Sequence, residues 1–144
     1  MNTAPISVLI ADDHGVVREG IRAYLATQPD LVVVADVDSG EAAAALCIEH
    51  VPDVALVDLL MPGIDGVETT RQIKAASPRT QVVVLTSSLD DAHAVPALRA
   101  GAISYLLKDV SPADLVDAVR RAARGESVLH PTVAARLVAA MRSP

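Results

Sequence analysis

The sequence predicts an α/β fold: a doubly wound, parallel, five-stranded sheet with helices on both faces. Five short apolar runs recur along the chain, and each is continuous and rich in β-branched residues, as in strands that are covered on both sides. The runs are residues 7–11, 31–35, 54–57, 81–86 and 103–107. Segments with helical periodicity separate them. A (βα) unit repeated five times with right-handed crossovers gives a doubly wound sheet.

The first two helices are predicted from an apolar face and a cap. An apolar face from Val17 to Leu25 predicts a helix that ends before Pro29, because proline cannot continue the hydrogen-bonding pattern. Ser39 is a good N-cap for a second helix over residues 41–50. These helices fill the gaps between the first three strands.

The third and fourth helices are marked by capping and by proline. Asp65 and Glu68 form a D-x-x-E capping pair for the third helix, which stops before Pro78. Pro96 is not tolerated deep inside a helix, so the fourth helix is expected to begin near Val95.

The fifth helix has the clearest boundaries. Ser111 followed by Pro112 opens it, and Gly125 ends it. Beyond Gly125, Pro131 opens a further helix with an apolar stripe of Val133, Leu137 and Met141. We therefore expect two parts: one domain over residues 1–125 and an appended helix within residues 126–144.

Composition excludes several classes of function. The chain has 144 residues, a net charge of −6 and almost no aromatic side chains, so it lacks both the basic surface and the stacking rings that nucleic-acid binding needs. One cysteine, Cys47, excludes an internal disulfide and fits a reducing compartment. No apolar stretch has the length of a membrane span, and the first residues do not form a signal peptide. We expect a cytoplasmic protein without membrane contact.

Polar residues follow four of the predicted strands. Asp12 and Asp13 follow the first strand, Asp58 ends the third, Thr86 ends the fourth and Lys108 follows the fifth. Because ligand chemistry in doubly wound folds collects at the carboxyl ends of the strands, we expect these side chains to meet.

Three carboxylates at one place require a cation. Like charges about 4 Å apart repel by roughly 4 kcal/mol per pair at an effective dielectric constant of 20, which one lysine cannot offset. An all-oxygen, acid-rich site favours Mg²⁺. We expect the ion at Asp13, Asp58 and the backbone carbonyl of Leu60, with Asp12 acting through water. A free oxygen of Asp58 could then attack phosphorus, while Thr86 and Lys108 contact the phosphoryl oxygens.

The motifs resemble a known family. "IADDH" after the first strand, "VDLLMPGIDG" around the third, "VLTS" at the fourth and "ALRAGAISYLLKD" through the fifth are similar to the receiver domain of two-component response regulators. The match covers residues 6–125, nearly the whole chain. "DDHGVVREGI" and the Asp109 after Lys108 resemble the NarL/FixJ subfamily, whose members end in a LuxR-type helix-turn-helix.

The resemblance implies a flavodoxin-like receiver fold and a signalling phosphoacceptor that catalyses only its own phosphorylation and dephosphorylation. A sensor histidine kinase would donate phosphate to Asp58, and Thr86 and Tyr105 would act as the switch that biases homodimerisation. Ser104 stands where the subfamily usually has Gly. No helix-turn-helix follows, so residues 126–144 resemble the linker helix toward an absent DNA-binding domain, either in a fragment or in a natural stand-alone receiver.

Other readings remain open. A haloacid-dehalogenase-like phosphatase also uses an aspartyl nucleophile with Mg²⁺, but it usually needs a second Asp two residues later, where this chain has Leu60. A flavodoxin-like electron carrier lacks support because there is no hydroxyl-rich loop after the first strand. A pseudo-receiver that serves only as a protein interaction module is the main alternative. His14 is expected to be a surface or packing residue at the start of the first helix rather than a ligand, because it does not have the neighbours of a transition-metal site.

Overall fold

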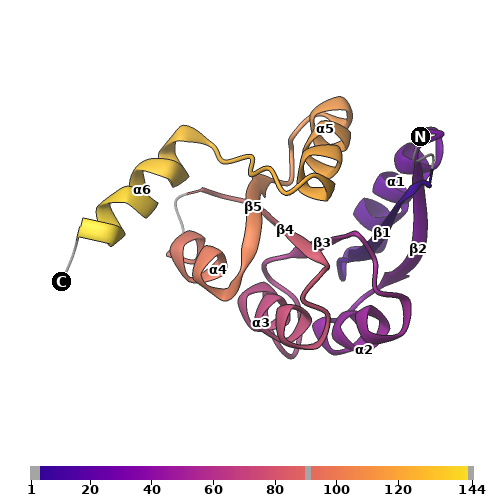
Figure 1. The fold of residues 1–144 in the computed structure, drawn as a ribbon, viewed down its shortest axis with the longest axis horizontal. Helices are drawn as coiled ribbons and strands as arrows, with labels where there is room; N and C mark the ends of the chain where they lie inside the picture. The colour runs from indigo at the N-terminus through magenta and orange to yellow at the C-terminus, as the bar shows by residue number, and fades with distance from the viewer. Residues whose placement is uncertain (1–3, 90–91, 143–144) are drawn as a thin grey trace.

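The predicted parallel sheet is present in the computed structural model, which describes residues 4–89 and 92–142 (Figure 1). The strands are β1 (Ile6–Ala11), β2 (Leu31–Val37), β3 (Val54–Asp58), β4 (Gln81–Thr86) and β5 (Ala102–Leu107). Their order across the sheet is β2-β1-β3-β4-β5, and every pairing is parallel. Each strand lies within two residues of its predicted bounds. The doubly wound fold is confirmed.

Helices cover both faces of the sheet (Figure 1). On one face lie α1 (Gly15–Ala26) and α5 (Pro112–Ala123), and on the other lie α2 (Gly40–His50), α3 (Gly66–Ala76) and α4 (Ala94–Ala100). Each face has its own apolar core: Val8 and Ile10 of β1 point toward α1 and α5, whereas Leu9 and Ala11 point toward the opposite helices. Successive side chains of a strand point to opposite faces, and both faces are buried here. Apolar residues are therefore needed on both faces, which gives the continuous apolar runs in the sequence.

The helix boundaries follow the predicted caps. The hydroxyl of Ser39 accepts a hydrogen bond from the amide of Ala42, and the carboxylate of Asp65 accepts one from the amide of Glu68. The hydroxyl of Ser111 caps α5 in the same way. Helix α4 begins one residue earlier than expected, so Pro96 lies in its first turn, where the missing amide costs no helical hydrogen bond.

The last helix, α6 (Pro131–Arg142), contacts α4 and extends outward from the sheet (Figure 1). Val133 is fully buried there, whereas Met141 at the far end of the predicted stripe is 76% exposed. The backbone before α6 lies along β5: the hydroxyl of Ser104 accepts a 2.8 Å hydrogen bond from the amide of Val128, and Leu129 forms a bridge with Tyr105. The first residue of the apolar stripe therefore packs in the core of the domain, whereas the last one is exposed to solvent.

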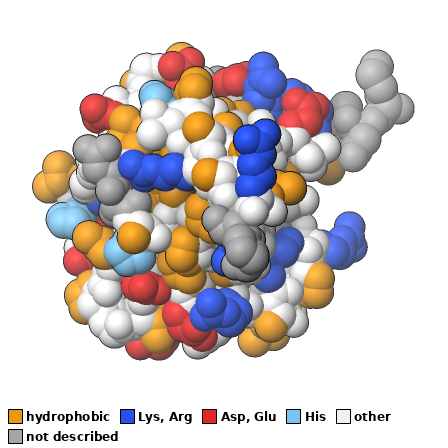
Figure 2. All heavy atoms as spheres, turned by 90° about the vertical axis from the view of Figure 1, so that its left-hand side faces the viewer, with side chains coloured by type: hydrophobic (Ala, Val, Ile, Leu, Met, Phe, Trp, Pro, Cys, Tyr) orange, Lys and Arg blue, Asp and Glu red, His pale blue; other side chains and the backbone are white. Residues whose placement is uncertain are grey.

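Figure 2 shows the side of the molecule on which α6 lies, where apolar side chains are exposed among Lys and Arg side chains. Arg136 of α6 donates a hydrogen bond to the carbonyl of Leu89, in the connection between β4 and α4. Within the described part of the chain, no helix is long and apolar enough to cross a membrane.

Candidate functional site

The fold brings the predicted site residues to one edge of the sheet. β1 and β3 are neighbours, so Asp12 and Asp13, just after β1, lie beside Asp58 at the end of β3. Backbone pairing continues past the strand ends: the amide of Asp12 donates to Val37 at 3.0 Å, and the amide of Lys108 donates to Thr86 at 2.7 Å. The main chain of the site is thus held by the sheet.

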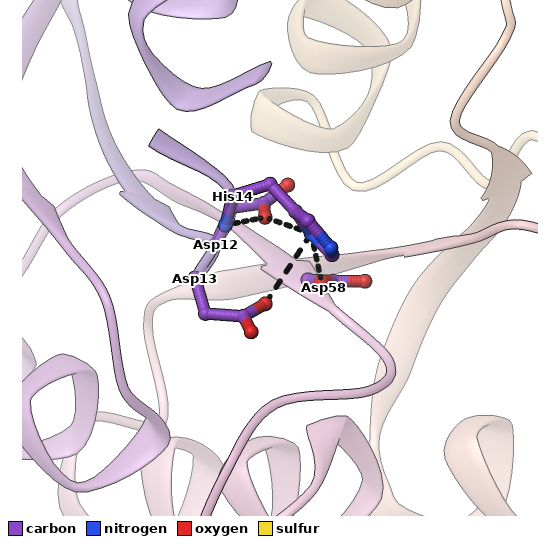
Figure 3. Close-up of side chains that lie close together, drawn as sticks. All are labelled: Asp12, Asp13, His14 and Asp58. Atoms are coloured by element: carbon purple, nitrogen blue, oxygen red, sulfur yellow. Dashed lines mark hydrogen bonds and ion pairs between the residues drawn. The ribbon is translucent and has the colours of Figure 1, made fainter. Parts of the chain in front are cut away.

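Three carboxylates form the centre of the site. One oxygen each of Asp12, Asp13 and Asp58, together with a ring nitrogen of His14, lie within 4.8 Å of one another (Figure 3). Asp12 is 1% exposed and Asp58 is 3% exposed, so two of the three charges are buried. A buried carboxylate is costly unless it is paired, so this cluster calls for a counter-charge.

Lys108 supplies part of that charge. Its Nζ lies 3.2 Å from Asp12 Oδ2 and 3.2 Å from Asp58 Oδ2. Burial alone would lower the pKa of Lys108, but the contacts with Asp12 and Asp58 outweigh it and raise the pKa above its ordinary value. Lys108 is therefore a fixed positive charge across the pH range in which proteins work.

The pKa of Asp58 is raised, first because burial disfavours its charged form and second because Asp12 repels it; Lys108 opposes both effects. The backbone amide of Leu60 also donates to the Asp58 carboxylate and lowers its pKa. With all three acids ionised, the single ammonium leaves two negative charges without a partner. The residues that the structure describes thus provide the charge that one divalent cation would neutralise.

The donor atoms fit such a cation. Three buried carboxylate oxygens, Asp12 Oδ2, Asp13 Oδ1 and Asp58 Oδ2, have no well-aligned hydrogen-bond donor in the described ranges and make ionic contacts with Lys108 or His14. Buried polar atoms normally have a partner, so atoms left open inside a cleft are potential ligand positions. Oxygen donors of this kind suit Mg²⁺.

His14 is a surface residue, as expected, and its ring also lies beside the acids. Its side chain is 62% exposed, as a surface residue should be, but its Nδ1 lies 3.1 Å from Asp12 Oδ1, 3.4 Å from Asp13 Oδ1 and 3.7 Å from Asp58 Oδ2. The ring faces the acids because the backbone turns at His14, the N-cap of α1. The "DDH" sequence was the available signal: a residue directly after two site acids shares their loop.

Thr86 and Tyr105 lie outside the acidic cluster. The hydroxyl of Thr86 donates to the carbonyl of Ser88 at 3.1 Å and accepts from the amide of Ser88 at 3.3 Å, so it closes the turn after β4. Tyr105 is fully buried in β5, in the core that also contains Val133 of α6. Leu60 lines the cleft and is 62% exposed.

Gly66 lets the start of α3 pack closely against the end of β3, which carries Asp58. Its amide donates to the carbonyl of Leu59 at 2.7 Å, and a Cβ at this position would lie 2.7 Å from the carbonyl oxygen of Asp58. Only glycine allows the start of α3 to approach the backbone of Asp58 so closely. The "DG" at residues 65–66 therefore helps to position the end of β3.

Residues 8–120 match the sequence profile of the response regulator receiver domain. The chain belongs to the response regulator receiver family. This confirms the family indicated by the strand-end motifs.

This receiver domain is similar to two longer bacterial regulatory proteins. It is 48% identical over 132 residues to the response regulator protein VraR of Staphylococcus aureus, covering 92% of this chain and 63% of VraR. It is 42% identical over 137 residues to the transcriptional regulatory protein LiaR of Bacillus subtilis, covering 95% of this chain and 65% of LiaR. The receiver domain thus spans slightly less than two thirds of the length of each.

A solved structure agrees with both fold and subfamily. A two-component response regulator of the LuxR family from Aurantimonas sp. superimposes with a TM-score of 0.85 at 30% identity, covering 97% of this chain and all of the other. The placement of this receiver domain with the LuxR-type regulators is confirmed.

Proposed function

We propose that this receiver domain accepts a phosphoryl group on Asp58 from a sensor histidine kinase, in the presence of Mg²⁺. The observation that carries the proposal is the position of the Asp58 carboxylate. It is almost fully buried at the carboxyl end of a central strand, and Lys108 and two further acids surround it. A nucleophile held beside a cation site and a fixed lysine has the parts that phosphoryl transfer needs.

In the reaction, an oxygen of Asp58 attacks phosphorus. The O–P bond of an acyl phosphate forms, the N–P bond of the phosphohistidine breaks, and its electron pair stays on the histidine nitrogen of the kinase. Lys108, already 3.2 Å from Asp58 Oδ2, favours the ionised form of Asp58 and is placed to pair with a phosphoryl oxygen. Mg²⁺, when bound by Asp13, Asp58 and the Leu60 carbonyl with Asp12 acting through water, would screen the negative charge of the phosphoryl oxygens.

The response of the domain to phosphorylation would begin at Thr86. A phosphoryl oxygen on Asp58 gives the Thr86 hydroxyl an alternative acceptor to the carbonyl of Ser88. We propose that this exchange and an adjustment of Tyr105 shift the conformational equilibrium and favour homodimerisation. The boundary near residue 125, with a linker helix leading to a LuxR-type DNA-binding domain, belongs to the same proposal, because VraR and LiaR are longer than this chain.

Intact mass spectrometry after incubation with acetyl phosphate tests the proposal. We expect the gain of one phosphoryl group that depends on Mg²⁺ and is lost in Asp58→Asn. Asp109→Asn is the matched control, since Asp109 is an exposed acid beside Lys108 and should leave the mass gain intact. Phosphorylation by this small donor without any kinase would also support catalysis by the domain itself.

No mass gain under any condition would contradict the proposal and would favour the alternative of a protein interaction module that is never phosphorylated. A gain that persists in Asp58→Asn would place the phosphoryl group on another residue and would remove Asp58 from the mechanism.

A further inference from the structure

Arg18 of α1 is hydrogen-bonded to the backbone of the acidic pair, Asp12 and Asp13. Its Nη1 donates a 2.5 Å hydrogen bond to the carbonyl oxygen of Asp12, and its Nε donates a 3.1 Å bond to Asp36 Oδ1. Arg18 is one turn after His14, and its own amide donates to the His14 carbonyl. The guanidinium therefore joins the peptide between Asp12 and Asp13 to strand β2.

Asp36 holds the Arg18 guanidinium in place and also binds a second arginine, Arg22. It is on β2 opposite Ile10 of β1, and its second oxygen, Oδ2, accepts a 2.5 Å bond from Nη1 of Arg22. Of the two arginines, Arg18 is the more enclosed, with a side chain 24% exposed against 59% for Arg22. A planar guanidinium that is bonded along two directions has little freedom to rotate, and its bonds to a charged acceptor are strong.

Both ends of the Asp12 residue are consequently tied to β2. The amide of Asp12 donates to the carbonyl of Val37, and the carbonyl of Asp12 accepts from the Arg18 that Asp36 holds. The Asp12 side chain reaches the opposite way, toward Lys108 at 3.2 Å and the His14 amide at 2.8 Å. The orientation of the two carboxylates depends on where this peptide lies.

We infer that Arg18 is a positioning residue for the acidic pair: it fixes the loop so that Asp12 and Asp13 present their carboxylates to the divalent cation. The inference rests on the proposed function, since it concerns the same cation. Outer partners that orient ligands typically change metal affinity by roughly 10- to 100-fold when they are removed. Arg18 touches neither Asp58 Oδ2 nor the cleft beside it, so its effect must pass through the Asp12 backbone.

The direction in which Mg²⁺ affinity changes on removal of Arg18 distinguishes a positioning role from a long-range effect of its charge. Arg18 is positive, so removing it should strengthen cation binding if only its long-range charge matters. Positioning predicts the opposite, a weakening. Arg22 provides the matched control because it carries the same charge and binds the same Asp36, but the structure shows no bond from it to the Asp12 carbonyl.

The experiment is a titration of the ¹⁵N-labelled chain with MgCl₂, followed by amide chemical shifts. We expect Arg18→Ala to weaken Mg²⁺ binding about tenfold. Arg18→Lys should weaken it nearly as much, because one ammonium cannot span the Asp12 carbonyl and Asp36 together. Arg22→Ala should bind Mg²⁺ as tightly as the natural sequence or slightly more tightly.

A second measurement needs no metal. In EDTA, hydrogen exchange of the His14 amide, which donates to Asp12 Oδ1, should become several-fold faster in Arg18→Ala and stay unchanged in Arg22→Ala. Phosphorylation by acetyl phosphate should recover in Arg18→Ala when Mg²⁺ is raised about tenfold, because only the affinity is altered.

The outcomes are distinguishable. Mg²⁺ binding by Arg18→Ala that equals or exceeds that of the natural sequence would overturn the inference, and so would equal weakening in Arg22→Ala. If the natural sequence binds no Mg²⁺ and gains no phosphoryl group, the proposed function fails instead, while the exchange of the His14 amide still decides whether Arg18 orders the loop. Should Arg18→Ala fail to fold, Arg18→Lys, which keeps the charge, carries the same comparison.

Discussion

Replacing Asp58 by Asn removes one of the three carboxylate charges that the fold holds together, and we expect the substitution to stabilise the domain in the absence of divalent cations. The carboxylate oxygens of Asp12 and Asp13 lie at most 4.8 Å from that of Asp58, and Lys108 Nζ lies 3.2 Å from it. The difference between the repulsion from the two acids and the attraction to Lys108 sets the size of the expected change in the free energy of unfolding.

At an effective dielectric constant of 20, each acid repels Asp58 by about 3.5 kcal/mol and Lys108 attracts it by about 5 kcal/mol. Repulsion exceeds attraction by about 2 kcal/mol. The pKa of Asp58 is raised first by burial and second by repulsion from Asp12. Because Asn keeps the shape of the side chain without its charge, we expect the free energy of unfolding to rise by about 1–2 kcal/mol and Tm by about 3–6 °C.

Thermal unfolding in EDTA and in excess Mg²⁺ measures the change in Tm. The natural sequence should gain stability on adding Mg²⁺, whereas Asp58→Asn should gain much less, since it lacks one ligand. Glu49→Gln, which removes an exposed charge on α2, is the control and should change Tm by little. A lower Tm for Asp58→Asn in EDTA, or an equal response to Mg²⁺ in both proteins, would refute the charge balance described above.

Three further changes have defined outcomes. Ser104→Ala removes the acceptor of the Val128 amide and should destabilise the attachment of α6 by about 1 kcal/mol, which would be visible as faster hydrogen exchange at Val128. Gly66→Ala places a Cβ 2.7 Å from the carbonyl of Asp58 and should cost more than about 1 kcal/mol and slow phosphorylation; unchanged stability in urea would contradict this. Burial raises the pKa of the Cys47 thiol to about 11, above its ordinary value of 9.0, so the unfolded chain loses this proton first and stability should fall between pH 9 and pH 11. Cys47→Ala should lack that part of the pH dependence, and parallel curves for the two proteins would contradict the assignment.

The sequence predicted the order of elements well because the signals involved are local. The continuous apolar run of β3 and the caps at Ser39, Asp65 and Ser111 each depend on residues within one turn or one strand. The strand ends that carry Asp58 and Lys108 followed from the same order, since parallel strands in a doubly wound sheet share their carboxyl edge.

Sequence reasoning missed the contacts that His14 and Arg18 make at the site. His14 faces the acids because α1 starts at that turn, and Arg18 reaches Asp12 only because β2 brings Asp36 alongside. A charged Asp36 directly after the apolar run of residues 31–35 was a signal that such a partner exists, but the sequence did not indicate which arginine it would bind.

What the sequence by itself determined about this protein is its doubly wound α/β fold and the set of acids and lysine that collect at one edge, because both follow from local periodicity and strand order. Only the tertiary structure decided that Arg18 ties the acidic loop to β2, that Thr86 turns toward Ser88, and that α6 buries Val133 against the domain. The contacts of Arg18 with Asp36 and of Val133 with the core join segments far apart in the chain. Neither propensity nor spacing specifies such contacts or the direction in which the Thr86 hydroxyl points.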